Sequence, residues 1–103
     1  MPARNPLTRE SSEDAADLLR ALANSHRVAI VVELADGERC VHELVDAVGV
    51  NQPLVSQHLR VLRAARLVKG HRRGREIAYC LANEHVAHIV QDAVLHGTER
   101  KRP

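Results

Sequence analysis

Aromatic side chains are nearly absent from this chain of 103 residues, which has no Phe, no Trp and a single Tyr. Hydrophobic residues still make up 45% of the sequence, so a core must be built from Leu, Val, Ala and Ile. Aliphatic packing of this kind favours helices packed on helices. We expect one domain, because a single core commonly fills a chain of about 100 residues.

Cysteine is also scarce, with only Cys40 and Cys80 present. Two cysteines do not make the disulfide framework of a small secreted domain. The N-terminus lacks the apolar run of a signal peptide, and no stretch approaches the ~20 apolar residues needed to span a bilayer. The sequence therefore predicts a cytoplasmic protein.

Signatures of catalysis are missing as well. The chain has no Gly-rich phosphate loop and no nucleophile with a base at a known motif spacing. The pair His42-Glu43 lacks the second His that a metalloprotease motif requires. We conclude that the chain is not an enzyme.

Charge is small overall but unevenly distributed. The formal net charge is +2, and acidic residues concentrate before residue 46. Basic residues crowd one later segment, namely Arg60, Arg63, Arg66, Lys69, Arg72, Arg73 and Arg75. Local clustering of this kind indicates a polyanionic partner.

The first half of the chain predicts three helices. Residues 1–11 show no apolar period and read as a flexible arm, followed by a helix over residues 12–23 that begins at Ser12. Ser25 is a plausible cap for a second helix ending at Ala35, before Asp36-Gly37. A short third helix is expected over residues 40–48, with Gly49 just beyond its end.

The stretch 51–63 predicts a helix that reads DNA. Asn51 is a plausible N-cap, and Pro53 is tolerated in a first turn. One face carries Leu and Val while the other is polar, and the preceding Gly-containing turn completes a helix-turn-helix pattern whose second helix enters the major groove. We expect DNA contacts from Gln52, Ser56, Gln57, His58, Arg60 and Arg63.

Residues 67–81 predict a β hairpin with a basic tip. Ile77, Tyr79 and Leu81 alternate along its second strand. A hairpin directly after a recognition helix is the wing of a winged helix, and its arginines would lie against phosphates or the adjacent minor groove. These arginines are Arg72, Arg73 and Arg75.

A last helix is expected from Asn83 to Gly97, followed by a polar tail at residues 98–103. The whole is therefore mostly α with a two-stranded β wing, in the order α-α-α-α-β-β-α, with the folded domain at residues 12–97. The first and last helices carry more apolar surface than so small a core needs, which indicates a homodimer through them.

Four motifs carry a resemblance to a known family. They are Leu19-Arg-Ala-Leu-Ala-Asn-Ser-His-Arg27, Cys40-Val-His-Glu-Leu44, Gln52-Pro-Leu-Val-Ser-Gln-His-Leu-Arg-Val-Leu-Arg63, and Gly74-Arg-Glu with Tyr79-Cys-Leu81. In order and spacing the chain resembles the ArsR/SmtB family of bacterial repressors over residues 15–99. The resemblance implies a dimeric winged helix that binds an inverted-repeat DNA operator and leaves it when an inducer binds, in most branches a metal ion.

The resemblance also implies a metal site on the last helix. Zinc-sensing members use an Asp and a His at the helix start with a His and an acidic residue near its end, and here these positions read Asn83, His85, His96 and Glu99. His85 and His96 lie about three turns apart on one stripe, so one ion joins them only across two antiparallel copies of the helix.

Asn83 departs from the family pattern, because a neutral amide oxygen is a weaker donor than a carboxylate. Water, Glu84 or His88 could complete the shell, or the metal preference could shift from zinc to nickel or cobalt. We expect Gly97 to end the helix before Glu99.

Two alternatives involve the cysteines. A second family site uses a Cys at the start of the third helix, where Cys40 and His42 stand, but residues 1–11 contain no Cys or His to close it. A redox-responsive repressor acting through Cys40 and Cys80 is the other alternative, although nothing in the sequence brings the two together.

Overall fold

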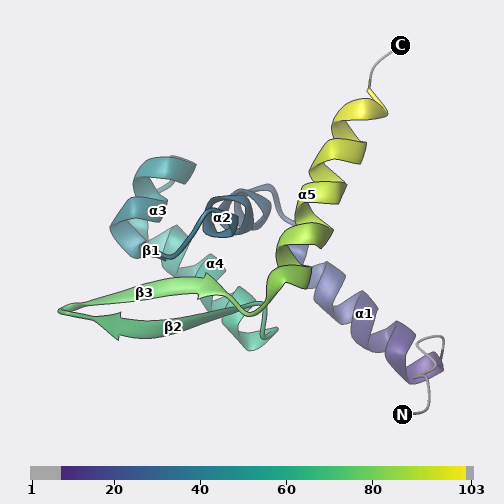
Figure 1. Cartoon of the computed structure of the whole chain (residues 1–103), viewed down its shortest axis with the longest axis horizontal. Coiled ribbons are helices and arrows are strands. Elements are labelled where there is room, and N and C mark those ends of the chain that lie inside the picture. The colour runs from purple at the N-terminus through teal and green to yellow at the C-terminus, as the bar shows by residue number, and fades with distance from the viewer. Residues whose placement is uncertain (1–7, 102–103) are drawn as a thin grey trace.

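The computed structural model describes residues 8–101 and confirms the expected winged helix-turn-helix (Figure 1). Within this range the chain forms five helices and a three-stranded antiparallel sheet of order β1-β3-β2. In chain order the elements are α1 (Arg9–Leu22), α2 (Ser25–Ala35), β1 (Arg39–Cys40), α3 (Val41–Val48), α4 (Gln52–Ala64), β2 (Val68–Arg73), β3 (Glu76–Leu81) and α5 (Glu84–Glu99).

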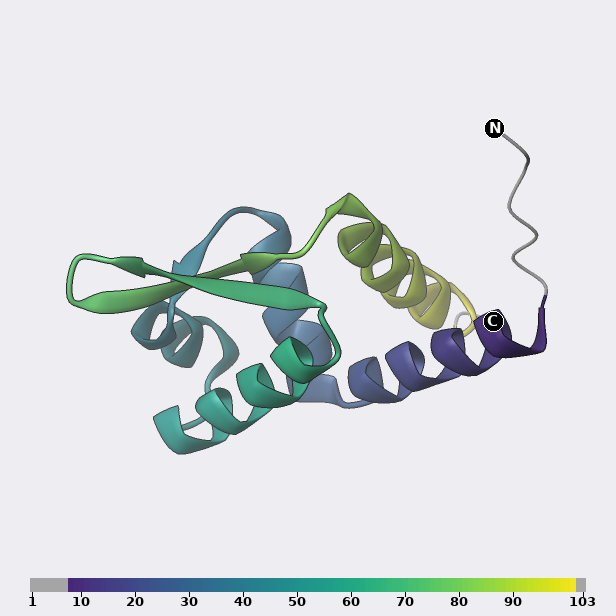
Figure 2. The same cartoon turned by 90° about the horizontal axis from the view of Figure 1, so that it is seen from below.

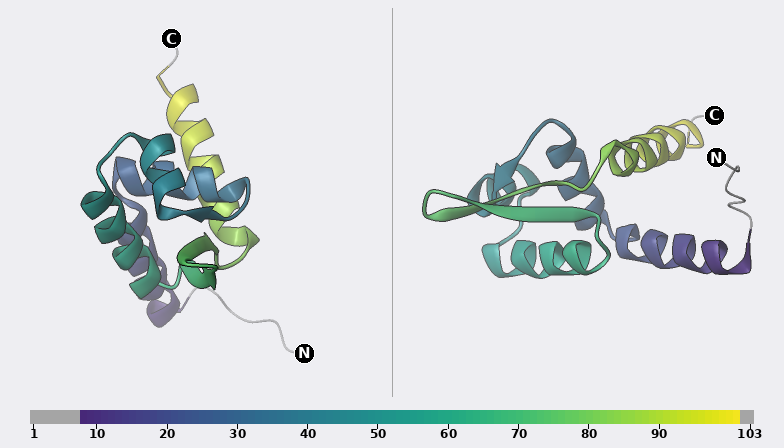
Figure 3. Two further views of the ribbon diagram at one scale, coloured as in Figure 1. Left: turned by 90° about the vertical axis from the view of Figure 1, so that its left-hand side faces the viewer. Right: turned by 60° about the horizontal axis from the view of Figure 1, so that its bottom comes forward.

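The molecule is flat, with extents of 44 × 43 × 21 Å. Its core lies where α2, α3 and α4 meet the sheet and the start of α5, and its buried members are all Leu, Ile or Val. Figure 2 shows the β2–β3 hairpin and α4 extending to one side while α1 and α5 extend to the other. The right-hand view of Figure 3 shows the same division. The chain thus has a wing side and a terminal-helix side.

The helix-turn-helix forms where the sequence places its local signals. The φ of Gly49 is +81°, a left-handed conformation that ends α3 and that side chains rarely adopt. Two residues later the Asn51 side chain accepts a hydrogen bond from the backbone N–H of Leu54 at 3.0 Å, and Pro53 occupies the first turn. The predicted N-cap of the recognition helix α4 is confirmed.

The end of α4 contains a residue with an unusual backbone conformation. Arg66 has φ +60°, and its N–H bonds to the carbonyl of Arg63 while the N–H of Leu67 bonds to that of Leu62. These two bonds form a Schellman motif, in which glycine is the common occupant of the left-handed position. Leu62 and Leu67 are both buried, so the motif fixes the direction in which the chain leaves α4 and enters the wing.

Three expectations about element limits are wrong, and one short strand was not predicted. α1 begins at Arg9, because Thr8 rather than Ser12 caps it, and most of the predicted arm, residues 1–7, lies outside the described residues. Asn24 rather than Ser25 caps α2. α5 continues through Gly97 to Glu99, since nothing there requires a left-handed residue. The sheet has three strands, because β1 pairs with β3 through Arg39↔Tyr79 and Cys40↔Ala78.

The terminal helices α1 and α5 diverge from the body like the arms of a V (Figure 1). Between them lies an apolar groove of about 180 Å³, lined by Leu19, Leu22, Ala23, Val28, Ile89, Val90 and Ala93. Leu19 and Ile89 in this groove are 54% and 37% exposed. We call this surface the terminal groove.

Candidate nucleic-acid interface and candidate metal ligands

The recognition helix α4 divides cleanly into a packed face and an open face. Val55, Leu59 and Leu62 are buried in the core. The predicted DNA-contacting residues Gln52, Gln57, Arg60 and Arg63 are exposed, and Ser56 is half-buried. The sequence-predicted interface therefore lies on solvent-facing turns of α4, with His58 as the exception described below.

A groove of about 460 Å³ joins α4 to the wing. It is lined by Ser56, Arg60, Arg63 and Ala64 from α4 and by Tyr79 from β3. Tyr79 stands opposite Gly70 of β2, where an added Cβ would lie 3.1 Å from the Tyr79 ring and 3.0 Å from Ile77. Glycine at position 70 therefore lets the tyrosine ring lie close against the hairpin, and the ring forms one wall of the groove.

The exposed basic residues along this groove form no ion pairs within residues 8–101. These residues are Arg60, Arg63, Arg72 and Arg75. Arg9, Arg20 and Arg39, which lie elsewhere, each pair with a carboxylate. A helix and a hairpin that display uncompensated guanidinium groups side by side suit the phosphates of a DNA duplex.

His58, unlike the other predicted DNA contacts on α4, is buried within the chain. Its side chain is only 7% exposed, and it lies between α4 and the first turn of α2. The His58 ring is tilted against the ring of His26 with centroids 5.5 Å apart, and its Nδ1 lies 3.3 Å from a guanidinium nitrogen of Arg27. The same Arg27 donates through Nε to the carbonyl of Ala21, near the end of α1. His58 thus joins α4 to α2 and α1.

Burial lowers the pKa of the His58 imidazole, and the positive charges of Arg27 and His26 lower it further. Its Nε2 is buried with no hydrogen-bond partner in the structure. A neutral ring is favoured by all three causes, because protonation would add a cation to a buried site beside two basic groups. The helical pattern did not reveal this, since the face that His58 occupies depends on how α2 crosses α4.

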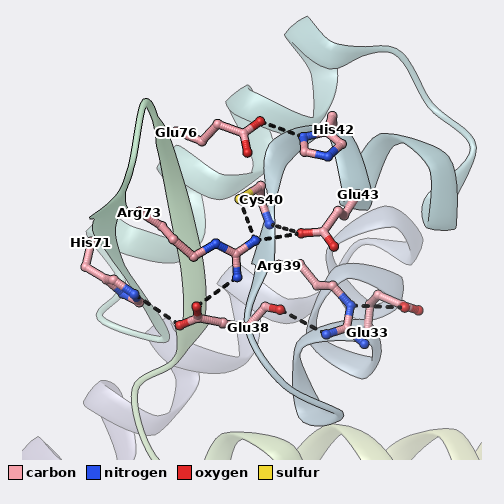
Figure 4. A network of polar contacts seen from close by, with 9 residues as sticks. All are labelled: Glu33, Glu38, Arg39, Cys40, His42, Glu43, His71, Arg73 and Glu76. Carbon is pink, nitrogen blue, oxygen red and sulfur yellow. Dashed lines mark hydrogen bonds and ion pairs between the residues drawn. The ribbon is translucent and has the colours of Figure 1, made fainter.

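Arg73, also predicted to contact a phosphate, is paired with two carboxylates of its own chain. Its guanidinium group lies 3.0 Å from Oε1 of Glu38 and 3.3 Å from Oε1 of Glu43, and donates to Sγ of Cys40 at 3.1 Å (Figure 4). The hydrogen bond with Glu38 and the nearby Cys40 raise the pKa of Arg73, so its charge is permanent and already compensated. Sequence reasoning missed Glu38 and Glu43, because their partner comes from a segment 30 residues away.

The register of the hairpin explains why neighbouring arginines differ. Successive side chains of a strand point to opposite faces of the sheet. Arg73 shares the face that carries Ala78 and its partner Cys40, whereas Arg72 pairs with Ile77 on the face that carries Tyr79. Arg72 is therefore on the groove side of the wing and Arg73 on the side of α3.

The predicted metal ligands all lie on α5 or at its start. Asn83, His85, His96 and Glu99 are exposed. The Oδ1 atom of Asn83 accepts a hydrogen bond from the backbone N–H of His85 at 2.9 Å, so this amide oxygen serves as the helix cap. Within residues 8–101 no three His, Cys, Asp or Glu side chains of one chain gather closely enough to hold a metal ion.

Cys40 and His42, the candidates for a second metal site, are held in other surroundings by the fold. Cys40 is fully buried, and burial raises the pKa of its thiol, which opposes formation of the thiolate that binds metals. His42 Nδ1 lies 2.8 Å from Oε1 of Glu76 on the wing. Glu43 is also committed, since it accepts the backbone N–H of Cys40, and this bond lowers the pKa of Glu43.

The strand β1 brings the two cysteines nearer than expected. Cys40 pairs with Ala78, so Cys80 is its diagonal neighbour on the same face of the sheet. Diagonal neighbours have Cα atoms roughly 7–8 Å apart, beyond the usual range of a disulfide. Both cysteines are free.

No helix among the described residues has the length and apolarity to cross a membrane.

Comparison with known proteins gives a consistent result. A model of the bacterial regulatory protein arsR family matches residues 24–69. The chain is 58% identical over 94 residues to the HTH-type transcriptional repressor SmtB of Mycobacterium tuberculosis, which covers 91% of this chain and 70% of that protein. It is 41% identical over 92 residues to the HTH-type transcriptional regulator NmtR of the same organism, covering 89% and 77%.

A solved structure agrees with the fold along almost the whole chain. The solution structure of the homodimeric winged helix-turn-helix DNA-binding domain of Mb0332 from Mycobacterium bovis, a possible ArsR-family regulator, superposes with a TM-score of 0.81 at 29% identity. The match covers 99% of this chain and 94% of that one.

Proposed function

This chain belongs to the ArsR/SmtB family of bacterial DNA-binding transcriptional regulators, and we propose that it is a dimeric repressor released from its operator by a metal ion, most simply zinc. The observation that carries the proposal is the exposed row of His85, His96 and Glu99 beside the terminal groove. An ion held there acts at a distance from the wing and α4, which read the operator.

DNA recognition uses the open face of α4 and the groove side of the wing. Phosphate contacts come from Arg60, Arg63, Arg72 and Arg75, which form no ion pair among residues 8–101. Gln52, Ser56 and Gln57 supply hydrogen bonds to base edges in the major groove. The operator is an inverted repeat, since a two-fold dimer presents its two recognition helices to two equivalent half-sites.

The dimer forms through α1 and α5. Leu19 and Ile89 leave the terminal groove open in one chain, and a second copy would cover it. The homodimeric state of the Mb0332 domain, which has the same fold, supports this. A two-fold interface pairs the same surface from both copies, and with the two-fold axis perpendicular to α5 this helix packs antiparallel on α5 of the partner.

Antiparallel packing completes the metal site. On a helix of 3.6 residues per turn, His85, His96 and Glu99 share one stripe with Ile89, a residue of the terminal groove. His85 and His96 are about 16 Å apart along one helix. When two copies cross near Ile89, the start of one meets the end of the other, which gives two equivalent sites per dimer.

The donor set fits zinc. Two imidazoles and one carboxylate are ordinary zinc ligands, and their side chains have no other bond within the described residues. Asn83 is already the cap of α5, so a water completes a tetrahedral shell. Nickel or cobalt is the alternative, because the exposed His88 adds an imidazole to the same helix and could raise the coordination number.

Metal acts by favouring one dimer geometry. A metal ion that links the two α5 helices stabilises an arrangement in which the recognition helices no longer match successive major grooves. By linkage, DNA then weakens metal binding by the same factor. His58 and Arg27, which connect α4 to the end of α1, give the terminal helices a direct route to the recognition helix.

The deciding experiment uses two variants, His85→Ala and His96→Ala, alone and co-expressed with different tags. Each single variant keeps the metal-free affinity for a duplex selected from a random pool by the wild-type protein, but zinc no longer lowers it. The mixed dimer regains one intact site, because one chain supplies His85 and the other supplies His96. Metal analysis then gives one zinc per mixed dimer and none per single-variant dimer.

The matched control is His88→Ala, which removes an exposed α5 histidine outside the zinc set. It keeps two zinc ions per dimer and the zinc response. Zinc binding that survives both His85→Ala and His96→Ala, or a mixed dimer that binds no metal, would contradict the site across the dimer. A response to nickel or cobalt that is lost in His88→Ala and in both site variants would favour the alternative.

A further inference from the structure

The underside of the wing carries a cluster of charged contacts that links three elements. Glu38 of the loop before β1 contacts both His71 and Arg73 of β2, at 3.1 and 3.0 Å. Glu43 of α3 contacts Arg73 at 3.3 Å. Figure 4 shows the Arg73 guanidinium lying between these two carboxylates with the Cys40 sulfur beside it.

We propose that Arg73, with Glu38 and Glu43, is a clamp that fixes the angle of the wing relative to α3, and that Arg73 positions the wing for DNA without touching DNA itself. This inference rests on the proposed binding of DNA by the wing. It differs from an ordinary basic wing in separating two adjacent arginines, of which Arg72 binds a phosphate and Arg73 holds the hairpin.

The position of Arg73 in the hairpin makes such a clamp effective. Arg73 is the last residue of β2, next to the turn at Gly74, whereas the hairpin joins the core at its other end through the buried Val68. A two-stranded hairpin is marginally stable alone, so the outer half of the wing needs a tether. The short strand β1 ends at Cys40 and pairs with β3 only as far as Ala78, which leaves the tip to the side-chain contacts.

A second contact supports the same tip. His42 of α3 lies 2.8 Å from Glu76, the first residue of β3 and the strand partner of Arg73. Both strands of the tip are thus connected to the β1–α3 segment by polar side chains. Since α3 and α4 form the helix-turn-helix unit, these contacts place the wing in a fixed relation to the recognition helix.

The chemistry of the cluster argues against a DNA contact by Arg73. A guanidinium group bound by two carboxylates would have to give up both ion pairs to reach a phosphate. Bringing Glu38 and Glu43 towards DNA would in addition repel it. Arg72, one residue earlier, is exposed, lies on the face of Tyr79 and has no acidic partner within residues 8–101.

The test compares Arg72→Gln with Arg73→Gln, which remove the same charge from adjacent positions. The affinity of the metal-free dimer for the wild-type-selected duplex is measured over a series of salt concentrations. Arg72→Gln lowers the steepness of log K against log [salt] by about 1.8, because the dimer loses one phosphate contact, worth about 0.9, in each half-site. Arg73→Gln leaves that slope unchanged while the affinity falls about fivefold, in line with two exposed ion pairs.

Glu38→Gln is the sharper test, because the clamp and simple charge repulsion predict opposite changes in DNA affinity. Loss of an acidic charge near DNA tightens binding by reducing repulsion, whereas loss of the clamp weakens it. We expect weaker binding, faster amide hydrogen exchange in residues 71–77, and a double variant with Arg73→Gln no weaker than the worse single variant. Asp46→Asn, which removes an α3 carboxylate outside the described ion pairs, is the control and does not weaken binding.

Two results would overturn the clamp. One is a loss of salt dependence in Arg73→Gln equal to that in Arg72→Gln, which would make Arg73 a phosphate contact. The other is tighter DNA binding by Glu38→Gln. Wild-type binding to the selected duplex is measured in the same series, so a failure of the DNA-binding proposal is recognised separately from a failure of the clamp.

Discussion

The wing side and the terminal-helix side of this protein differ in how complete they are within one chain. The wing is fixed by backbone pairing, by Tyr79 over Gly70 and by the contacts of Arg73. The terminal helices instead diverge and expose Leu19 and Ile89. The side chains of His85 and His96 on α5 form no ion pair or hydrogen bond within residues 8–101. The proposed DNA-binding surface is therefore complete in one chain, whereas the proposed metal-binding surface needs a second copy.

This difference explains how one small chain can be both a rigid reader and a responsive switch. A reader needs its phosphate-binding groups held in place, so extra contacts on the wing side help it. A sensor needs two arrangements of similar free energy, and an interface between copies provides them more readily than a packed core. The division assigns fixed geometry to the wing side and variable geometry to the terminal groove.

The largest expected effect comes from Leu19→Glu in the terminal groove. A charged side chain there cannot be buried against a second copy, so the dimer dissociates while each chain stays folded. DNA affinity then falls about 100-fold or more, because the two half-sites are no longer bound together. Sedimentation and circular dichroism check the two claims. Val32→Glu, at an exposed apolar residue outside the groove, is the control and should change neither the oligomeric state nor the DNA affinity. A Leu19→Glu protein that remains dimeric would contradict the interface.

A smaller effect is expected from Asn83→Asp, which sharpens the role of α5. Asp and Asn cap helices about equally well, so stability is unchanged. A carboxylate adds an anionic donor to the proposed site, and zinc affinity rises about tenfold, measured by competition with a chelator. The same change in His85→Ala protein should give no gain. A tenfold gain in that background would place the zinc elsewhere.

Local signals in the sequence predicted most of the fold, and long-range contacts account for what it missed. Asn51, Pro53 and Gly49 fixed the start of α4 because their effects act within a few residues. The strand β1 has only two residues and exists because Tyr79 and Ala78 pair with it. Its absence from the prediction hid the proximity of Cys40 to the wing.

The predicted interface shows the same limit at single residues. The helical pattern separated Arg60 and Arg63 from the core, but His58 lies against α2, and only the crossing of two helices could reveal this. Arg72 and Arg73 have identical chemistry and adjacent positions. Their different surroundings follow from the hairpin register, which the composition of the turn does not specify. The metal ligands on α5 remain a prediction, because they need a partner chain.

A still smaller effect concerns the junction between the two sides, at His58. Burial and the neighbouring Arg27 and His26 lower the His58 pKa in the folded state, so between that pKa and the ordinary value near ~6.5 the unfolded chain binds more protons. The contribution of the neutral His58 ring to the free energy of unfolding is therefore fully present above pH ~6.5 and decreases as the pH drops towards the lowered pKa. Thermal unfolding from pH ~8 to ~5 measures this.

The variant His58→Gln keeps an acceptor for Arg27 but does not titrate. Its unfolding midpoint should fall less steeply with decreasing pH than that of the wild type. His88→Gln, at an exposed histidine of α5, keeps the wild-type dependence. Equal pH dependence in wild type and His58→Gln would show that this ring is not held neutral by the junction.

The smallest effect is expected from Arg66→Gly, which tests how far the wing side is fixed by its backbone. Arg66 holds φ +60° in the Schellman motif, a conformation that costs a side chain roughly 1 kcal/mol and glycine very little. Glycine also gains entropy in the unfolded chain, so the net stabilisation is about 0.5 kcal/mol, a rise of roughly 2–4 °C in the unfolding midpoint. Arg66→Ala, which removes the same side chain but keeps the Cβ, should give no rise. If both variants were equally stabilised, the cause would be the lost positive charge beside Arg63, and the backbone at the end of α4 would carry no strain.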